Sequence, residues 1–178
     1  MTGLIFQGFS VQRMLEGKKT ATRRLTHWPK QDATPVTVAK VPNLWLALDE
    51  ETERPIAGFT YRSHSPGKAL YVKESYLLQD DDSILYKADL TPEKAAEVKK
   101  WGNPIFMKEI YARLYVRITD VHIQRVHEMT EEDARAEGAT SLADFRRVWN
   151  TLHDEDRWDT NPWVCAYTFT VHPIPKDR

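Results

Sequence analysis

Two segments in the second half of the chain alternate between apolar and polar residues, and this pattern constrains the fold more than any other feature. In residues 111–126 the apolar side chains recur at every second position, with a shift near Asp120: Leu114, Val116, Ile118, Val121 and Ile123. Residues 163–171 alternate in the same way. A period of two places alternate side chains on opposite faces of a strand. We therefore expect a long strand over 111–126, bent near Asp120, and a closing strand over 163–171.

Shorter apolar runs and helix caps complete the pattern. We expect short strands at residues 4–6, 36–38, 44–48, 56–61, 70–73 and 84–87. Four residues are suited to cap short helices at their N-termini: Ser10, Thr91, Thr130 and Ser141. Gly17 and Gly138 are suited to end the first and third of these helices. Many short strands with a few short helices predict an α+β fold. We interpret residues 1–178 as one domain, a small mixed β-barrel with several short flanking helices.

The charges nearly cancel, with 25 Lys and Arg against 26 Asp and Glu. This balance excludes a strongly basic nucleic-acid coat protein. It is uneven, however, because residues 1–47 hold seven basic and two acidic residues, a local net charge of seven minus two, +5. The single Cys165 rules out an internal disulfide, and no run approaches the ~20 apolar residues of a membrane-spanning helix. We expect a cytoplasmic protein with no membrane partner.

Several familiar kinds of catalytic site are missing from the sequence. The six His residues include no i, i+4 pair with a Glu between them, so we expect no metal. No Gly-x-Ser-x-Gly hydrolase motif and no Gly-x-x-x-x-Gly-Lys phosphate loop occurs, and we expect no cofactor. Cys165 lies in the alternating segment 163–171 and is expected to be buried rather than nucleophilic.

The densest polar segment, residues 18–24, follows directly after Gly17. One interpretation is a solvated basic loop whose lysines stabilise the end of a helix. The other is a site in which Lys19 and Thr22, three apart in a turn, converge. A lysine beside another cation can lose its proton and act as a base for the threonine hydroxyl. In that case Arg23 and Arg24 would hold the substrate or its oxyanion.

Glu74 is the candidate acid, because the apolar strand 70–73 runs directly into it. Burial beside Tyr71 or Tyr76 would raise the pKa of this carboxyl, which suits proton transfer. An equally good interpretation of this segment alone is a glutamate at a strand end that pairs with an arginine.

At these residues the sequence resembles the ASCH-domain family of PUA-like barrels, and more closely its phage and prophage members. Residues 17–24 fit the family pattern Gly-x-Lys-x-x-Thr-x-Arg. Further similarity lies in residues 70–74, at Trp101, Met107 and Arg113, and in residues 130–138 and 161–164. The matched segments follow one another in the family's order and cover nearly the whole chain.

The resemblance implies a PUA-like barrel with a cleft beside residues 17–24. It also implies an amidohydrolase that removes the acetyl group from N4-acetylcytidine without a metal or cofactor. The catalytic residues would be Lys19, Thr22 and Glu74. The substrate, a nucleoside or modified base, would contact Arg23, Arg24, Tyr71 and Arg113. Because other family members bind or cleave RNA, an RNA-binding module or ribonuclease using the same basic cleft is the alternative.

Overall fold

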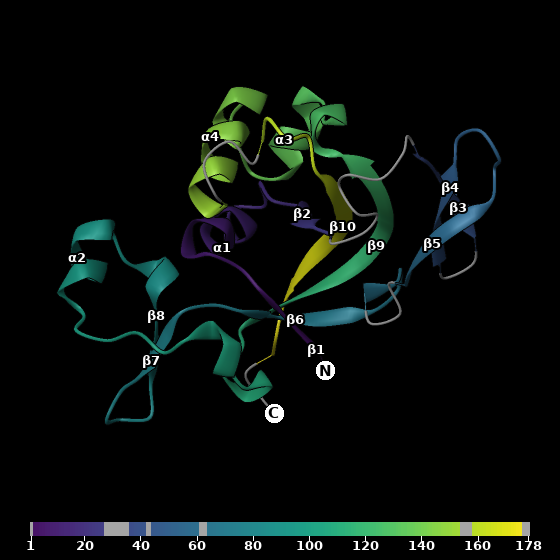
Figure 1. Cartoon of the computed structure of the whole chain (residues 1–178). Helices are drawn as coiled ribbons and strands as arrows, with labels where there is room; N and C mark the ends of the chain where they lie inside the picture. The colour runs from purple at the N-terminus through teal and green to yellow at the C-terminus, as the bar shows by residue number, and fades with distance from the viewer. Residues whose placement is uncertain (1, 27–35, 42–43, 61–63, 154–157, 176–178) are drawn as a thin grey trace.

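A five-stranded mixed sheet lies at the centre of the fold (Figure 1). The computed structural model describes residues 2–26, 36–41, 44–60, 64–153 and 158–175. Only the neighbours β1 and β6 run parallel, and the other pairs are antiparallel. In spatial order the strands are β1 (Thr2–Ile5), β6 (Ala69–Lys73), β9 (Leu114–Arg125), β10 (Trp163–Pro173) and β2 (Ala21–Leu25).

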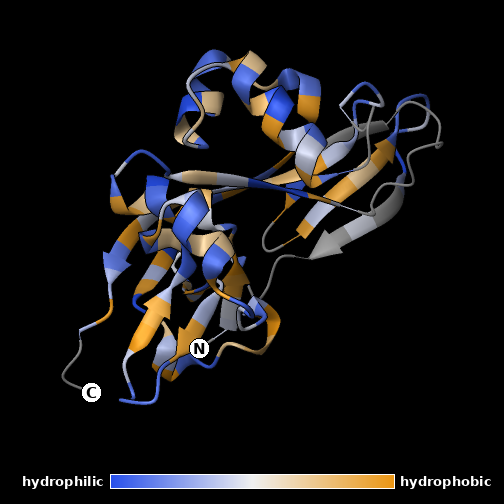
Figure 2. Ribbon diagram, turned by 90° about the vertical axis from the view of Figure 1, so that its left-hand side faces the viewer, coloured by the Kyte–Doolittle hydropathy of each residue, from blue (hydrophilic) through white to orange (hydrophobic). Residues whose placement is uncertain are grey.

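The two long alternating segments form the middle of this sheet, as predicted. β9 and β10 pair along their whole length, and hydrophobic and hydrophilic bands alternate along the strands (Figure 2). The register shifts where Thr168 faces Asp120 and Phe169 faces Ile118, so that Thr119 is an extra residue on β9. Such a bulge bends a strand, and the bend predicted near Asp120 is confirmed.

The fold contains two smaller sheets besides the five-stranded sheet, and a main hydrophobic core that residues from both kinds of sheet build. The second sheet lies in Figure 1 beside β9 and sends Trp45 and Ala47 into the core, together with Leu70, Val116 and Phe169. It consists of β3 (Val36–Val41), β4 (Leu44–Asp49) and β5 (Pro55–Thr60), and the third sheet of β7 (Tyr76–Leu78) and β8 (Ile84–Tyr86). Each of the predicted short strands is present, although Tyr61 lies outside the described residues. β7 was not expected.

Three of the four predicted helix caps are confirmed. Thr91, Thr130 and Ser141 each accept a backbone hydrogen bond at the start of a helix. Ser10 is not a cap, because the Val11 N–H already bonds to the Gln7 carbonyl and the first helix begins at Gly8. The helices are α1 (Gly8–Leu15), α2 (Pro92–Glu97), α3 (Glu131–Ala136) and α4 (Leu142–Leu152). Within the described ranges no helix is both long and apolar enough to cross a membrane.

The structure has the expected α+β architecture, but the expected closed barrel is not seen in the described part of the chain. β1 and β2 are the edges of the five-stranded sheet, and no backbone ladder joins them in the described part of the chain. A side chain links them instead, since Arg24 of β2 donates a hydrogen bond to the carbonyl oxygen of Ile5 in β1. The Arg24 guanidinium also lies 5.1 Å from the centre of the Phe6 ring. The sheet is therefore curved enough for one long side chain to connect its two edges.

Candidate active site

A cavity of ≈ 400 Å³ lies beside the edge strand β2. Its walls come from β2, the link between β1 and α1, α1 itself, and the segment from the end of α3 through α4. The polar residues of the wall include Lys19, Thr22, Arg23, Arg24 and Glu137, and the apolar residues include Phe9, Phe145, Val148, Trp149 and Leu152. The cavity thus combines a cluster of reactive and charged groups with an apolar surface, as small-molecule sites do.

Residues 21–25 form a strand and not the turn that was expected. Thr22 pairs with Tyr167 and Arg24 with Cys165 on β10, so the side chains of Thr22 and Arg24 leave β2 on the same face. Thr22 is 5% exposed. Lys19 precedes the strand and is held in place by the Thr20 N–H, which donates to the Ala136 carbonyl at 2.7 Å. Lys19 and Thr22 still reach one cavity, although the backbone between them is extended.

Lys19 is buried against the end of α3. Its Nζ lies 2.6 Å from Oε2 of Glu137 and 2.8 Å from the backbone oxygen of the same residue. Gly138, with φ +88, ends the helix, and its N–H and that of Ala139 donate to carbonyls in the last turn of α3. This glycine-terminated helix end places both acceptors of Glu137 beside the lysine.

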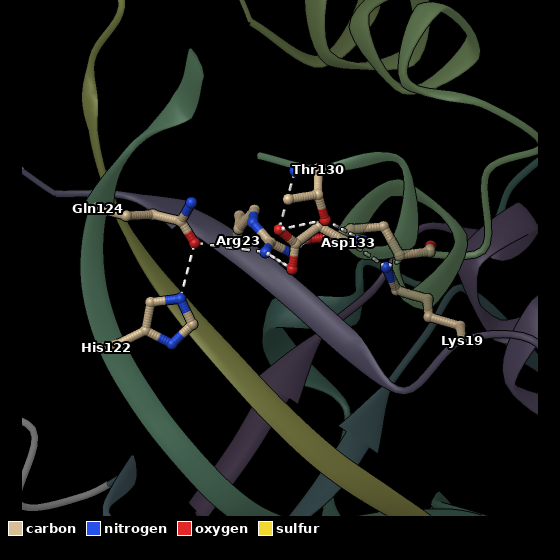
Figure 3. Close-up of polar contacts among 7 residues, drawn as sticks. Lys19, Arg23, His122, Gln124, Thr130 and Asp133 are labelled. Carbon is tan, nitrogen blue, oxygen red and sulfur yellow. Dashed lines mark hydrogen bonds and ion pairs between the residues drawn. The ribbon is translucent and has the colours of Figure 1, made fainter. Parts of the chain in front are cut away.

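Arg23 connects the same cluster to β9 and to the start of α3. Its Nη2 lies 2.6 Å from Asp133 Oδ1 and 3.3 Å from Gln124 Oε1, and its Nη1 lies 3.4 Å from Glu137 Oε1. Figure 3 shows Arg23 between Gln124 and Asp133, with Gln124 also bonded to His122. Every terminal nitrogen of this buried guanidinium is paired, so the Arg23 side chain is firmly oriented.

The protonation of Lys19 is set by competing effects. Burial lowers the pKa of the Lys19 ammonium, Glu137 opposes this shift, and the charges of Arg24 and Arg23 lower the pKa further. Burial likewise lowers the pKa of Arg24. The Nε–H groups of Arg23 and Arg24 are buried and have no hydrogen-bond partner among the described residues. Unpaired buried donors are costly to the stability of the fold.

Glu74 pairs with Arg113 and is not among the residues that line this cavity. Glu74, 1% exposed, accepts two hydrogen bonds from Arg113, at 2.9 Å from Nε and 3.0 Å from Nη2. Burial raises the pKa of Glu74 against the opposing effect of Arg113. Tyr71 is also elsewhere, with its hydroxyl donating to the Met107 carbonyl at 3.0 Å. Glu74, Tyr71 and Arg113 do not line the cavity.

The seven predicted site residues therefore fall into two groups. Lys19, Thr22, Arg23 and Arg24 meet at the cavity, whereas Glu74, Tyr71 and Arg113 form a separate polar and aromatic cluster. Of the two interpretations of Glu74, the glutamate paired with an arginine describes its position. Glu74 makes no recorded contact with Lys19 or Thr22 among the described residues, and the prediction that the three form one site stays a prediction.

Sequence reasoning missed Glu137, the carboxylate that does line the cavity. Glu137 was part of the matched segment 130–138, but nothing in a single glutamate before a glycine points to chemistry. The usable signal was Gly138, because a helix-ending glycine fixes the direction of the residue before it. Lys19 and Glu137 are 118 residues apart in the chain, so no local pattern connects them.

The described side chains also bear on two other kinds of chemistry, metal binding and thiol reactivity. In the part of the chain that the structure describes, no group of three or more His, Cys, Asp or Glu side chains is suited to hold a metal ion. Cys165 is 2% exposed, and burial raises the pKa of its thiol to about 12. The prediction that Cys165 is a packing residue is consistent with this environment.

Comparison with known proteins gives structural similarity but no sequence match. No protein-family model and no curated protein matches the sequence. The chain is similar to the crystal structure of protein EF3133 from Enterococcus faecalis V583, which carries the family designation DUF984, with a TM-score of 0.45 and 12% sequence identity. The similarity covers 100% of this chain and 85% of that chain.

Proposed function

We propose that the protein is a hydrolase of the ASCH group that removes the acyl group from the exocyclic amine of an N4-acylated cytosine or cytidine. The observation that carries the proposal is the meeting of Lys19 and Thr22, the amine and the hydroxyl of the Gly-x-Lys-x-x-Thr-x-Arg pattern, in one cavity with two arginines. A volume of ≈ 400 Å³ is in the range of small-molecule sites. The cavity therefore suits a nucleoside better than a polymer.

The proposal includes the fold family. In a PUA-like barrel the edges of the sheet approach each other, and here the Arg24 side chain links β1 to β2. Arg24 is also the last residue of the sequence pattern, so one residue both links the two sheet edges and lines the cavity. This double role supports the family assignment.

The reaction begins with proton transfer from Thr22 to Lys19. The neutral amine of Lys19 takes the hydroxyl proton of Thr22, and Thr22 Oγ1 forms a bond to the acyl carbon. The carbonyl oxygen becomes an oxyanion, which the Arg24 guanidinium, on the same face of β2 as Thr22, would stabilise. A buried lysine with a lowered pKa suits the base.

The second half of the reaction releases both products. The bond between the acyl carbon and the exocyclic nitrogen breaks, and the Lys19 ammonium returns its proton to that nitrogen, which leaves as the amine of cytosine. Water then attacks the acyl carbon of the Thr22 ester while Lys19 accepts one of its protons. The bond between Thr22 Oγ1 and the acyl carbon breaks, Lys19 returns the proton to Oγ1, and the carboxylic acid departs. Lys19 supplies both proton transfers, so the scheme needs no step at Glu74.

The test is the release of cytidine from N4-acetylcytidine by purified protein, followed by chromatography in the presence of a metal chelator. We expect turnover by the wild type and a fall in kcat/KM of about 10²- to 10⁴-fold for Lys19→Ala, the usual contribution of a general base. Lys18→Ala is the matched control, because Lys18 is exposed and pairs with Glu16 at 2.9 Å. A wild type as inactive as Lys19→Ala would refute the proposal for this substrate.

A further inference from the structure

Glu137 contacts Lys19 more closely than any other charged group and has no role in the reaction as written above. Its carboxylate is 5% exposed and accepts from Lys19 through Oε2 at 2.6 Å and from Arg23 through Oε1 at 3.4 Å. Its backbone oxygen accepts a second hydrogen bond from Lys19. One residue thus occupies two of the three donor positions of the ammonium group.

We propose that Glu137 is the positioning residue of this site, which fixes Lys19 Nζ at the cavity wall and thereby sets the pH range in which Lys19 can accept a proton. The part of this inference that concerns turnover rests on the proposed hydrolase function. The part that concerns Lys19 itself does not, because it can be measured without substrate.

A role in stability alone explains this arrangement poorly. Removing two charges from water costs several kcal/mol for each ion, so a buried ion pair is often no better than a pair of apolar residues. The pair also lies on a ligand-sized cavity and not in a closed core. The Lys19 ammonium is held by two acceptors on one side, which leaves its third hydrogen-bonding direction for another group.

Glu137 shifts the pKa of Lys19 in a definite direction. Burial and the charges of Arg24 and Arg23 lower the pKa of Lys19, whereas Glu137 raises it. Glu137 therefore keeps Lys19 protonated up to a higher pH than the cavity would otherwise allow. The charged and titratable groups that line the cavity, or pair with residues that line it, are Arg13, Glu16, Arg23, Arg24, Asp133, Glu137, Asp144, Arg147 and His153. Lys19 also borders a second cavity, which His172 lines.

The first experiment compares the pH profile of kcat/KM for the wild type, Glu137→Gln and Glu137→Asp. Activity rises with pH as Lys19 loses its proton. In Glu137→Gln we expect this rise about 1 to 3 pH units lower, the usual effect of removing an opposite charge within hydrogen-bonding distance. Glu137→Asp keeps the charge and should keep the rise within about 1 pH unit of the wild type, with a lower plateau.

The matched control is Glu132→Gln, which removes the same charge from the exposed side of α3. It should leave the position of the rise unchanged. If Glu137→Gln lowers the plateau but leaves the rise where it is in the wild type, Glu137 is only structural and the inference is wrong.

The second experiment needs neither substrate nor turnover. The chemical shift of the Lys19 side-chain carbon next to Nζ is followed by NMR as pH is raised, with Lys19→Arg identifying the signal. We expect Lys19 to titrate at lower pH in Glu137→Gln than in the wild type, and an unchanged midpoint would overturn the inference. If N4-acetylcytidine is not hydrolysed but this midpoint moves, the proposed function fails and the role of Glu137 stands.

If Glu137→Gln does not fold, the titration of Lys19 in Glu137→Asp decides instead. A titration midpoint far from that of the wild type would contradict a charge-based role of Glu137.

Discussion

At the scale of single residues, Thr22 offers the sharpest test of the chemistry. Replacing Thr22 by Val removes the hydroxyl but keeps the branched shape in an environment where the side chain is 5% exposed. We expect Thr22→Val to lose about 10²-fold or more in kcat, because a nucleophile cannot be replaced by a methyl group. Thr22→Ser keeps the hydroxyl and should retain a measurable part of the activity. Equal activity of Thr22→Val and the wild type would exclude Thr22 as the nucleophile.

A second prediction for a single residue concerns Glu74 and the stability of the fold. Glu74→Gln removes a buried carboxylate from Arg113, which keeps its hydrogen bonds to Asp89 at 2.7 and 2.8 Å. We expect a loss of about 1–3 kcal/mol in the free energy of unfolding, the cost of leaving a buried donor without its partner. Urea unfolding measures this loss. At saturating substrate kcat should stay within about threefold of the wild type, and a loss as large as that of Lys19→Ala would return Glu74 to the catalytic residues.

The two glycines that end helices allow a comparison at the scale of elements. Gly17 and Gly138 both have positive φ, at 70° and 88°, and both follow helices whose last carbonyls they help to satisfy. A Cβ at Gly17 would meet no atom within 4 Å, whereas one at Gly138 would lie 2.9 Å from the Cβ of Arg13. The two positions therefore have similar backbone conformations and very different surroundings.

We expect Gly17→Ala to cost about 1 kcal/mol in stability, from the left-handed conformation alone. Gly138→Ala should cost more, because α1 must also move away from the new methyl group. It should further reduce activity, since Glu137 and Lys19 lie at that helix end. Thermal unfolding and kcat/KM of both variants provide the measurement. Equal effects of the two substitutions would show that Gly138 is needed only for its φ.

The elements also show how far the sequence predicts this fold. Caps such as Thr130 and strands such as β9 could be predicted because their signals lie within a few residues: a hydroxyl that bonds three residues ahead, or a period of two. β2 could not, because its cations suggested an exposed loop. Arg23 becomes buried only through Asp133 and Glu137, which are 110 and 114 residues away. Long-range ion pairs leave no local pattern, and the same reason explains why Glu137 was missed.

At the scale of the whole molecule, the near-neutral net charge is accompanied by ion pairs between cations and carboxylates within the folded chain. Five of the cations in residues 1–47, namely Arg13, Lys18, Lys19, Arg23 and Lys40, meet carboxylates in the described part of the chain. Arg13 and Lys18 both contact Glu16, at 3.0 and 2.9 Å, and at the other side of the cavity Arg147 lies 2.7 Å from Asp144. The cations around the cavity are thus largely neutralised by the protein itself, which argues against a surface that follows an RNA backbone.

This pairing predicts weak and nearly salt-independent binding to RNA. Each phosphate that a protein neutralises on a single strand adds about −0.7 to the slope of log K against log salt concentration. With most cations around the cavity already paired, we expect a slope no steeper than about −1 for a short single-stranded RNA bound there, measured by fluorescence anisotropy at several salt concentrations. Glu16→Gln frees Arg13 and Lys18 from their shared carboxylate and should make the slope steeper, which serves as the positive control. A wild-type slope steeper than about −2 would favour the RNA-binding alternative, because only a row of unpaired cations produces it.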